Sequence, residues 1–221
     1  MTHLNINVQM CPIKTGNLMA SPTSQKRIHA AAIRLFAETG AQKISIRDLA
    51  EEAGVARGTI YAYLDQSPDL FERTAERLAH DLHLRIAKGA VKLDDPAHKV
   101  ALGIFHFIDQ AQANPDWGRF LCQFGFTAQQ LTQLWHAQPM HDISLGVQRG
   151  RFDLTQSQIR SAVTLLASAV MGAIQVILSG HKGWREAYVE VTELILKAFG
   201  INSSEASAIA AERANHTPLH S

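Results

Sequence analysis

The fold of this chain is decided by Ser45–Leu64, SIRDLAEEAGVARGTIYAYL, which predicts two short helices joined by a tight turn. Ser45 can cap the first helix, and Asp48 three residues later completes the pattern of a capping box. Apolar residues recur at helical spacing as far as Ala53. Gly54 follows them, and glycine can end a helix at positive φ at little cost.

The second short helix begins at Arg57 and carries Ile60 and Leu64 one turn apart on its inner face. The other side chains of this helix are expected to point wholly or partly outward: Arg57, Gly58, Thr59, Tyr61, Ala62 and Tyr63. Arginine can bind guanine edges in a major groove, glycine allows close approach, and tyrosine hydroxyls suit phosphate oxygens. On spacing alone, a surface helical hairpin without a ligand is the alternative.

The segment Lys26–Leu70 resembles the DNA-binding domain of the TetR (tetracycline-repressor) family of bacterial transcriptional regulators. The family pattern is a first helix with an apolar "A…LF…G" signature, followed by a helix–turn–helix with an aromatic-rich recognition helix. The matching positions are Ala31, Ala32, Leu35, Phe36 and Gly40, then Ser45 to Ala50, Ala53-Gly54-Val55 and Gly58-Thr59-Ile60-Tyr61.

Two positions depart from the family pattern. Ala56 stands where the family usually has a serine or threonine that caps the recognition helix. Ser67 stands near the start of the fourth helix, where the family usually has a phosphate-binding lysine. Ser67 followed by Pro68 still makes a good helix start, whose backbone N–H groups can hold a phosphate.

The resemblance implies which residues contact DNA and how. Arg57 and Thr59 are assigned to the bases, and Gly58 to close approach of the backbone. The residues assigned to phosphates are Ser45, Arg47, Tyr61, Tyr63 and Ser67.

Composition is that of an ordinary globular protein, because 46% of the 221 residues are apolar and 19% are charged. The net charge is only +1, and six basic residues face five acidic ones between Ser21 and Gln66. DNA affinity must therefore come from the placement of a few cations and not from their excess. The two cysteines give no disulfide framework, and Met1–Ala20 lacks the features of a signal peptide, so we expect a cytoplasmic protein.

Helical periodicity without strand alternation predicts an all-α chain of about nine helices. The expected organisation has five parts: a tail at 1–21, a three-helix helix–turn–helix domain at 22–66, a linking helix at 67–88, a helical ligand-binding and dimerisation domain at 89–200, and a tail at 201–221 holding at most one short helix. Pro139 is expected to kink or split one helix near Gln138. The uncharged run Ser161–Ser179 is close to the length of a membrane span, but we interpret it as a buried helix of a protein that does not enter a membrane.

By resemblance, the two long helices at about 155–180 and 184–199 pair with a second copy to form a homodimer. Small residues in the first of them favour close helix approach. The resemblance also implies a cavity for a small-molecule effector that releases the protein from a palindromic operator in double-stranded DNA. The residues expected to line this cavity are Trp117, Phe120, Trp135, Met140 and Gln175.

No motif for a nucleotide, a cofactor, a metal or a catalytic nucleophile is found, so we expect neither an enzyme nor a cofactor. His80 and His83 lie one turn apart, and we interpret them as part of a solvated face and not as metal ligands. The function predicted is a ligand-responsive transcriptional repressor. The alternative is a ligand-binding or adaptor module with weak or lost DNA binding, which Ala56, Ser67 and the near-neutral charge would support.

Overall fold

The computed structural model describes residues 21–40, 44–64, 69–90 and 93–215, and within these ranges it contains eleven α-helices, one short 3₁₀ turn and no strand. The all-α prediction is confirmed. The helices are α1 (Pro22–Thr39), α2 (Ile46–Ala53), α3 (Arg57–Leu64), α4 (Leu70–Ala90), α5 (Pro96–Ala113), α6 (Pro115–Phe124), α7 (Gln129–His136), α8 (Gln138–Gln148), α9 (Ile159–Leu178), α10 (Trp184–Ala198) and α11 (Ser203–Ala214).

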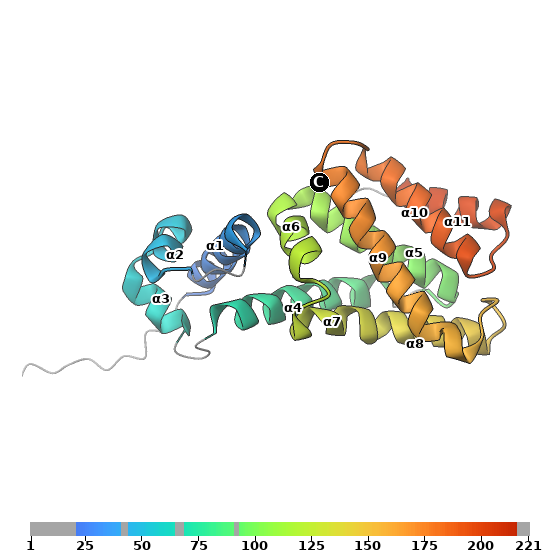
Figure 1. Cartoon of the computed structure of the whole chain (residues 1–221), viewed down its shortest axis with the longest axis horizontal. Helices are drawn as coiled ribbons and strands as arrows, with labels where there is room; N and C mark the ends of the chain where they lie inside the picture. Colours follow the sequence, from blue (N-terminus) through green and yellow to red (C-terminus); the bar gives the residue numbers. More distant parts are fainter. Residues whose placement is uncertain (1–20, 41–43, 65–68, 91–92, 216–221) are drawn as a thin grey trace, which may run out of the picture.

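Figure 1 shows the helices arranged as a small head and a larger body. The head is formed by α1, α2 and α3, and the body by α5 to α11. Helix α4 begins beside the head and runs along the body, where it contacts α5 and α7. The DNA-reading helix predicted from the sequence therefore lies at one end of the molecule.

Local signals in the sequence set the ends of the head helices as expected. The Ser45 hydroxyl accepts a hydrogen bond from the Asp48 backbone N–H at 3.1 Å and so caps α2. Gly54 ends the same helix in the left-handed region, at φ +59°, which a residue with a Cβ rarely adopts. Ser45 thus sets the start of α2, and Gly54 sets the turn that leads from α2 to α3.

Two more helices are found than the nine expected. Pro139 lies in the first turn of α8, and the chain is divided there into α7 and α8. The segment after residue 200 forms α11, which is longer than the short helix expected in a tail. It packs on α5 and α10 and buries Ala206, Ile209 and Ala210, so it is part of the body.

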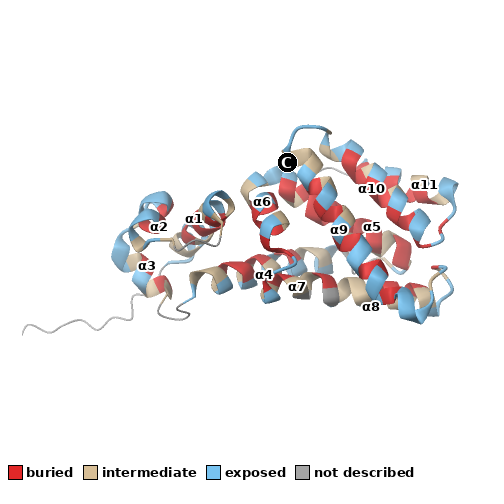
Figure 2. Ribbon diagram, viewed as in Figure 1, coloured by how far each residue is buried: buried red, intermediate tan, exposed pale blue. Residues whose placement is uncertain are grey.

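Helix α9 runs through the body with one face buried and the other open (Figure 2). With the preceding turn it spans Gln156–Leu178, which is long and apolar enough to cross a membrane, and 39% of its most apolar window is buried. Its buried residues pack against α5, α6, α8 and α10. The helix is thus a core element on one side, while Leu165 on its other side is 48% exposed.

Four phenylalanines join the head to the body. Phe36 of α1 lies 5.1 Å, centroid to centroid, from Phe71 of α4, and Phe71 lies 4.9 Å from Phe124 of α6. Phe120 completes the group at 5.0 Å from Phe124. Edge-on and tilted ring pairs at these distances stabilise by about 0.5–1.5 kcal/mol beyond the area they bury. We call these four residues the aromatic joint.

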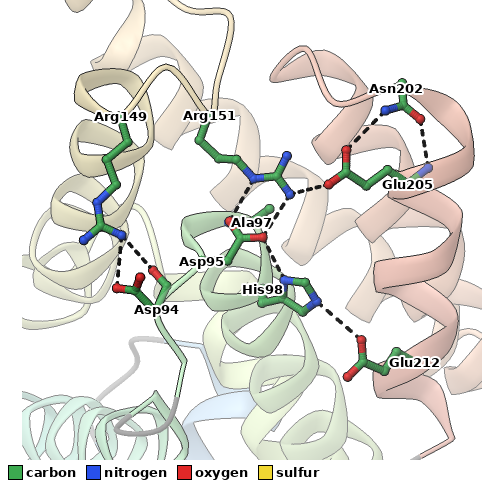
Figure 3. Close-up of polar contacts among 9 residues, drawn as sticks. All are labelled: Asp94, Asp95, Ala97, His98, Arg149, Arg151, Asn202, Glu205 and Glu212. Atoms are coloured by element: carbon green, nitrogen blue, oxygen red, sulfur yellow. Dashed lines mark hydrogen bonds and ion pairs between the residues drawn. The ribbon is translucent and has the colours of Figure 1, made fainter.

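A polar network closes the far end of the body (Figure 3). The Arg151 guanidinium donates to both oxygens of Asp95 at 2.9 Å and to Glu205 of α11 at 2.6 Å. His98 contacts Asp95 at 2.9 Å and Glu212 at 3.4 Å. Although partial burial opposes the charged form, hydrogen bonds from Arg151, His98 and a backbone N–H hold the pKa of Asp95 far below its usual range.

Replacing Arg151 with methionine should lower the free energy of unfolding by about 1–3 kcal/mol at neutral pH, because it leaves a partly buried Asp95 without its cation. A carboxylate with a depressed folded-state pKa stabilises fully above its unfolded pKa of about 3.8, and this contribution is lost as the pH falls below that value. The difference between wild type and R151M, measured by urea unfolding, should therefore shrink on acidification.

The matched control is Arg149→Met, because Arg149 pairs with an Asp94 side chain that is 91% exposed. This change should alter the free energy of unfolding by less than about 0.5 kcal/mol. Equal effects of the two substitutions would contradict a stabilising role for the Arg151 network.

Candidate DNA-binding surface and ligand cavity

Helix α3 displays a polar face and buries an apolar one. Arg57 and Gly58 are exposed, Tyr61 is 62% exposed, and Thr59 is half-buried. Ile60 is fully buried in the head. The exposed face therefore carries the residue types that the sequence assigned to bases and to close backbone approach.

Gly58 has no packing role in the head. A Cβ built at this position would meet no atom within 4 Å. No described neighbour in the protein therefore requires a glycine here. The role assigned to Gly58 from the sequence, close approach of the helix backbone to DNA, remains a prediction.

The expectation that Tyr63 points outward is wrong. Its side chain is 1% exposed, and the Arg73 guanidinium of α4 lies over its ring, 4.1 Å from the centroid. Tyr63 follows Ile60 by three residues, so it falls on the same inner face of α3. Its hydroxyl has no hydrogen-bond partner among the described residues, and Tyr63 cannot reach a phosphate in this structure.

The remaining assigned phosphate contacts lie at the start of α2 or outside the described residues. Ser45 is exposed, although its hydroxyl already caps α2. The Arg47 side chain is 71% exposed, with a 3.4 Å contact to Asp48. Ser67 lies outside the described residues. Arg47 is thus accessible to a phosphate, as is Tyr61 of α3.

The body holds a cavity of about 260 Å³ between α4, α5, α7, α8 and α9. Its walls are largely apolar, and a smaller number of polar side chains reach it. The apolar lining residues include Ile86, Val100, Ile104, Phe107, Trp135, Leu166 and Val170, and the polar ones are His80, His83, Lys99, Gln138 and Asp142. An apolar cavity with a few polar groups is typical of a small-molecule site.

One of the five residues expected to line the cavity does so. Trp135 lines it, and its ring stacks on Phe107 with centroids 4.6 Å apart and planes 17° apart. Its indole N–H donates to the Gly125 carbonyl at 3.2 Å, which fixes the ring.

The other four expected residues do not line this cavity. Trp117 lines a smaller hollow of about 110 Å³ beside His29, where burial lowers the pKa of the histidine to about 4. Phe120 is fully buried in the aromatic joint, and Met140 packs against the core. Gln175 is exposed on the open face of α9. Helical periodicity identifies buried faces, but it does not tell which buried side chains border a cavity.

The sequence analysis did not select the polar lining residues. His80 and His83 were interpreted as a solvated face, and they are exposed but border the cavity. Asp142, 6% exposed, is one of few buried acids among the described residues. Gln138 donates to it at 2.9 Å, and burial raises the pKa of its carboxyl group against the opposing effects of Gln138 and Lys99. An acid inside an amphipathic helix is the signal that could have found it.

An exposed helix of a helix–turn–helix head, joined by α4 to a helical body with an apolar cavity, defines the class of DNA-binding regulators with a sensor domain. Residues 95–212 match the family model described as the tetracyclin repressor-like C-terminal domain, and residues 28–73 match that of bacterial regulatory proteins of the tetR family. The chain belongs to the TetR family, which confirms the resemblance. Members of this family are DNA-binding regulators and not enzymes; they bind operator DNA and small-molecule ligands, and they dimerise.

Solved structures and a curated relative agree with this family. The structure of RolR in complex with the ligand resorcinol is similar over 90% of this chain and 96% of RolR, with 25% identity and a TM-score of 0.63. The fatty acid degradation regulator FadR from Bacillus halodurans shares the fold, with 19% identity over 78% of this chain and 94% of FadR and a TM-score of 0.64. An HTH-type transcriptional regulator of Haemophilus influenzae is 42% identical over 53 residues, which are 24% of this chain and 28% of that protein.

The two tyrosines of α3 give a direct test of which face meets DNA. Tyr63→Phe removes a buried hydroxyl that has no partner among the described residues, so it should leave operator affinity unchanged and alter the free energy of unfolding by about 0–1 kcal/mol, in the stabilising direction. Tyr61→Phe removes an exposed hydroxyl and should weaken operator binding with no loss of stability.

Fluorescence anisotropy with labelled operator DNA and urea unfolding provide the two readouts. The reverse pattern, in which Y63F weakens operator binding and Y61F does not, would mean that the face assigned to DNA is the wrong one.

Proposed function

We propose that this protein is a transcriptional repressor of the cytoplasm that a small molecule, bound in the cavity of the body, releases from a palindromic operator. The observation that carries the proposal is the path of α4. Near its start, Phe71 belongs to the aromatic joint with the head, and further along, His80, His83 and Ile86 border the cavity. A ligand that fits only one position of α4 would therefore favour one position of the head.

The proposed contacts with DNA follow from the exposed side of α3. Arg57 and Thr59 read base edges in the major groove, and Gly58 lets the helix backbone come close. Tyr61, Arg47 and Ser45 bind phosphates and fix the register of the head on the duplex. Tyr63 is left out because it is buried.

A homodimer through α9 and α10 is proposed because these two helices pack against each other and each exposes a leucine. Leu165 of α9 is 48% exposed and Leu194 of α10 is 66% exposed. Gly172 of α9 is also exposed, and a Cβ there would meet no atom within 4 Å, so nothing described in a single subunit requires this glycine. A second copy packed closely against α9 would cover all three positions and place two α3 helices about one turn of DNA apart.

The effector is proposed to be a small organic molecule. The cavity volume of about 260 Å³ suits a ligand of few atoms, and the neighbour RolR is described as binding resorcinol. The similarity to RolR covers 90% of this chain, which supports a small-molecule effector for this protein as well.

An adaptor that has lost DNA binding is the second candidate. It is favoured by the near-neutral charge and by Ala56, which offers no side-chain cap to α3. A gel-shift assay with the DNA upstream of the chain's own gene, at a stated salt concentration, separates the two functions. A retarded band at low salt supports the repressor, and no band at any salt concentration supports the adaptor.

Arg57→Ala should weaken operator binding by about 1–3 kcal/mol and relax specificity at one base pair in each half-site, because an exposed arginine at the start of α3 is placed to bind a base. Binding is measured by anisotropy on a set of operators with single base changes. Arg149→Ala, a loss of the same charge at the far end of the body, is the control and should leave affinity and specificity unchanged. Unchanged base preference in R57A would remove Arg57 from base readout.

Leu194→Glu should convert the dimer to a monomer, because it places a charge in the centre of the proposed apolar interface. Sedimentation velocity measures the change. Leu84→Glu is the matched control, since Leu84 is 44% exposed on α4, away from α9 and α10, and it should leave the dimer intact. A dimeric L194E protein would place the interface elsewhere.

A further inference from the structure

The cavity of the body contains a buried acid whose hydrogen-bonding capacity is not filled by the described part of the protein. Asp142 lines the cavity although its residue is only 6% exposed. Within the described residues, the hydrogen bond found to its carboxyl group is the one that Gln138 donates to Oδ1 at 2.9 Å. An ionised carboxylate is an acceptor with two oxygens and about four lone-pair sites, so Asp142 can accept further donors from a ligand.

Gln138 holds the acid in place. The two residues lie one turn apart on α8, which itself packs against α5 and α9, so the carboxyl group has a defined direction. In a cavity with apolar walls, a preorganised acceptor favours a ligand that donates a hydrogen bond, such as one with a hydroxyl group, over an analogue that cannot donate one. Lys99, which also borders the cavity, acts electrostatically on Asp142 in favour of its charged form, and a hydroxyl donates more strongly to a charged carboxylate.

The apolar walls favour a second feature of the ligand, an aromatic ring. Phe107 and Trp135 are nearly parallel and 4.6 Å apart, and both line the cavity. The Trp135 ring is held in place, since its N–H is already bound to the Gly125 carbonyl. Aromatic rings of a ligand pack well against such a pair, edge-on or offset. The volume of about 260 Å³ suits a ligand with one ring.

We propose that the ligand is a neutral monocyclic phenol, and that Asp142 is the residue that selects it by accepting a hydrogen bond from a ring hydroxyl while the ring packs against Phe107 and Trp135. The proposal rests on the proposed function only in taking this cavity as the effector site. Aromatic carboxylates are disfavoured at this position, because buried Asp142 would repel a second negative charge and Lys99, the lysine of the lining, already acts on Asp142.

The first experiment uses the wild-type chain and isothermal titration calorimetry. Three probes form a series, resorcinol, 3-fluorophenol and 1,3-difluorobenzene, in which fluorine replaces a hydroxyl at nearly constant shape. The fourth probe is benzoate, which carries a negative charge. A hydrogen bond to a charged acceptor predicts that both phenols bind about 10–100-fold more tightly than 1,3-difluorobenzene. Benzoate should bind more weakly than either phenol. Equal binding of 1,3-difluorobenzene or of benzoate, or no binding of either phenol, overturns the proposal.

The second experiment changes the acid. Asp142→Asn keeps the shape of the side chain but replaces one acceptor oxygen with a donor. It should weaken the binding of resorcinol by about tenfold or more and leave the affinity for 1,3-difluorobenzene unchanged. Asp116→Asn makes the same change on the surface of α6, outside the cavity, and should alter the affinity for neither ligand. Gln138→Leu, which leaves the acid but removes its positioning partner, should lower resorcinol affinity to a smaller extent. Equal loss of both ligands in D142N contradicts selection by a hydrogen bond.

Failure of this inference can be told apart from failure of the proposed function. If phenols bind through Asp142 but operator affinity does not change, the ligand class stands and the release mechanism fails. If operator DNA is released by a ligand that cannot donate a hydrogen bond, the release mechanism stands and the role of Asp142 fails.

Discussion

The aromatic joint is the contact on which the rest of the structure depends. Phe36 belongs to the head, Phe71 to α4, and Phe120 and Phe124 to the body, so three segments meet in one group of rings. Close-packed side chains transmit displacement because they leave little space for it to be absorbed. The position of the head is therefore tied to that of α4 and α6.

A ligand-responsive regulator needs this mechanical connection because its DNA-binding helix and its ligand cavity lie in different parts of the molecule. Helix α3 lies at one end of the molecule (Figure 1), and the cavity lies between α4 and the helices of the body. Helix α4 belongs to both regions, since it contacts α1 near its start and α5 and α7 further along. Ligand and operator would then compete through the preferred position of one helix, without touching each other.

The sequence predicted the head better than the body. Ser45 and Gly54 act through their own backbone neighbours, so a local pattern is sufficient to place them. Tyr63 was placed wrongly because a tyrosine in a recognition helix suits phosphate binding as well as packing, although its spacing from Ile60 puts it on the buried face, where it contacts α4. Ser67 and the residues before α1 lie outside the described residues, so those expectations remain predictions.

The cavity could not be predicted because it depends on what several helices leave unfilled. Periodicity identified Phe120 and Trp135 as inward-facing, and both are buried, but one fills the joint while the other borders a void. Asp142 was not selected from the sequence, because an acid in an amphipathic helix is more often exposed than buried. Its importance is visible only when its burial, its bond to Gln138 and its place beside the cavity are seen together.

The coupling between the two sites is tested most directly by a closed thermodynamic cycle. The Kd for operator DNA is measured with and without saturating resorcinol, and the Kd for resorcinol is measured with and without saturating operator, at one salt concentration. Linkage through α4 predicts that each ligand weakens the other by the same factor, typically about 5–150-fold. Identical resorcinol affinities for the free and the operator-bound protein would contradict the account.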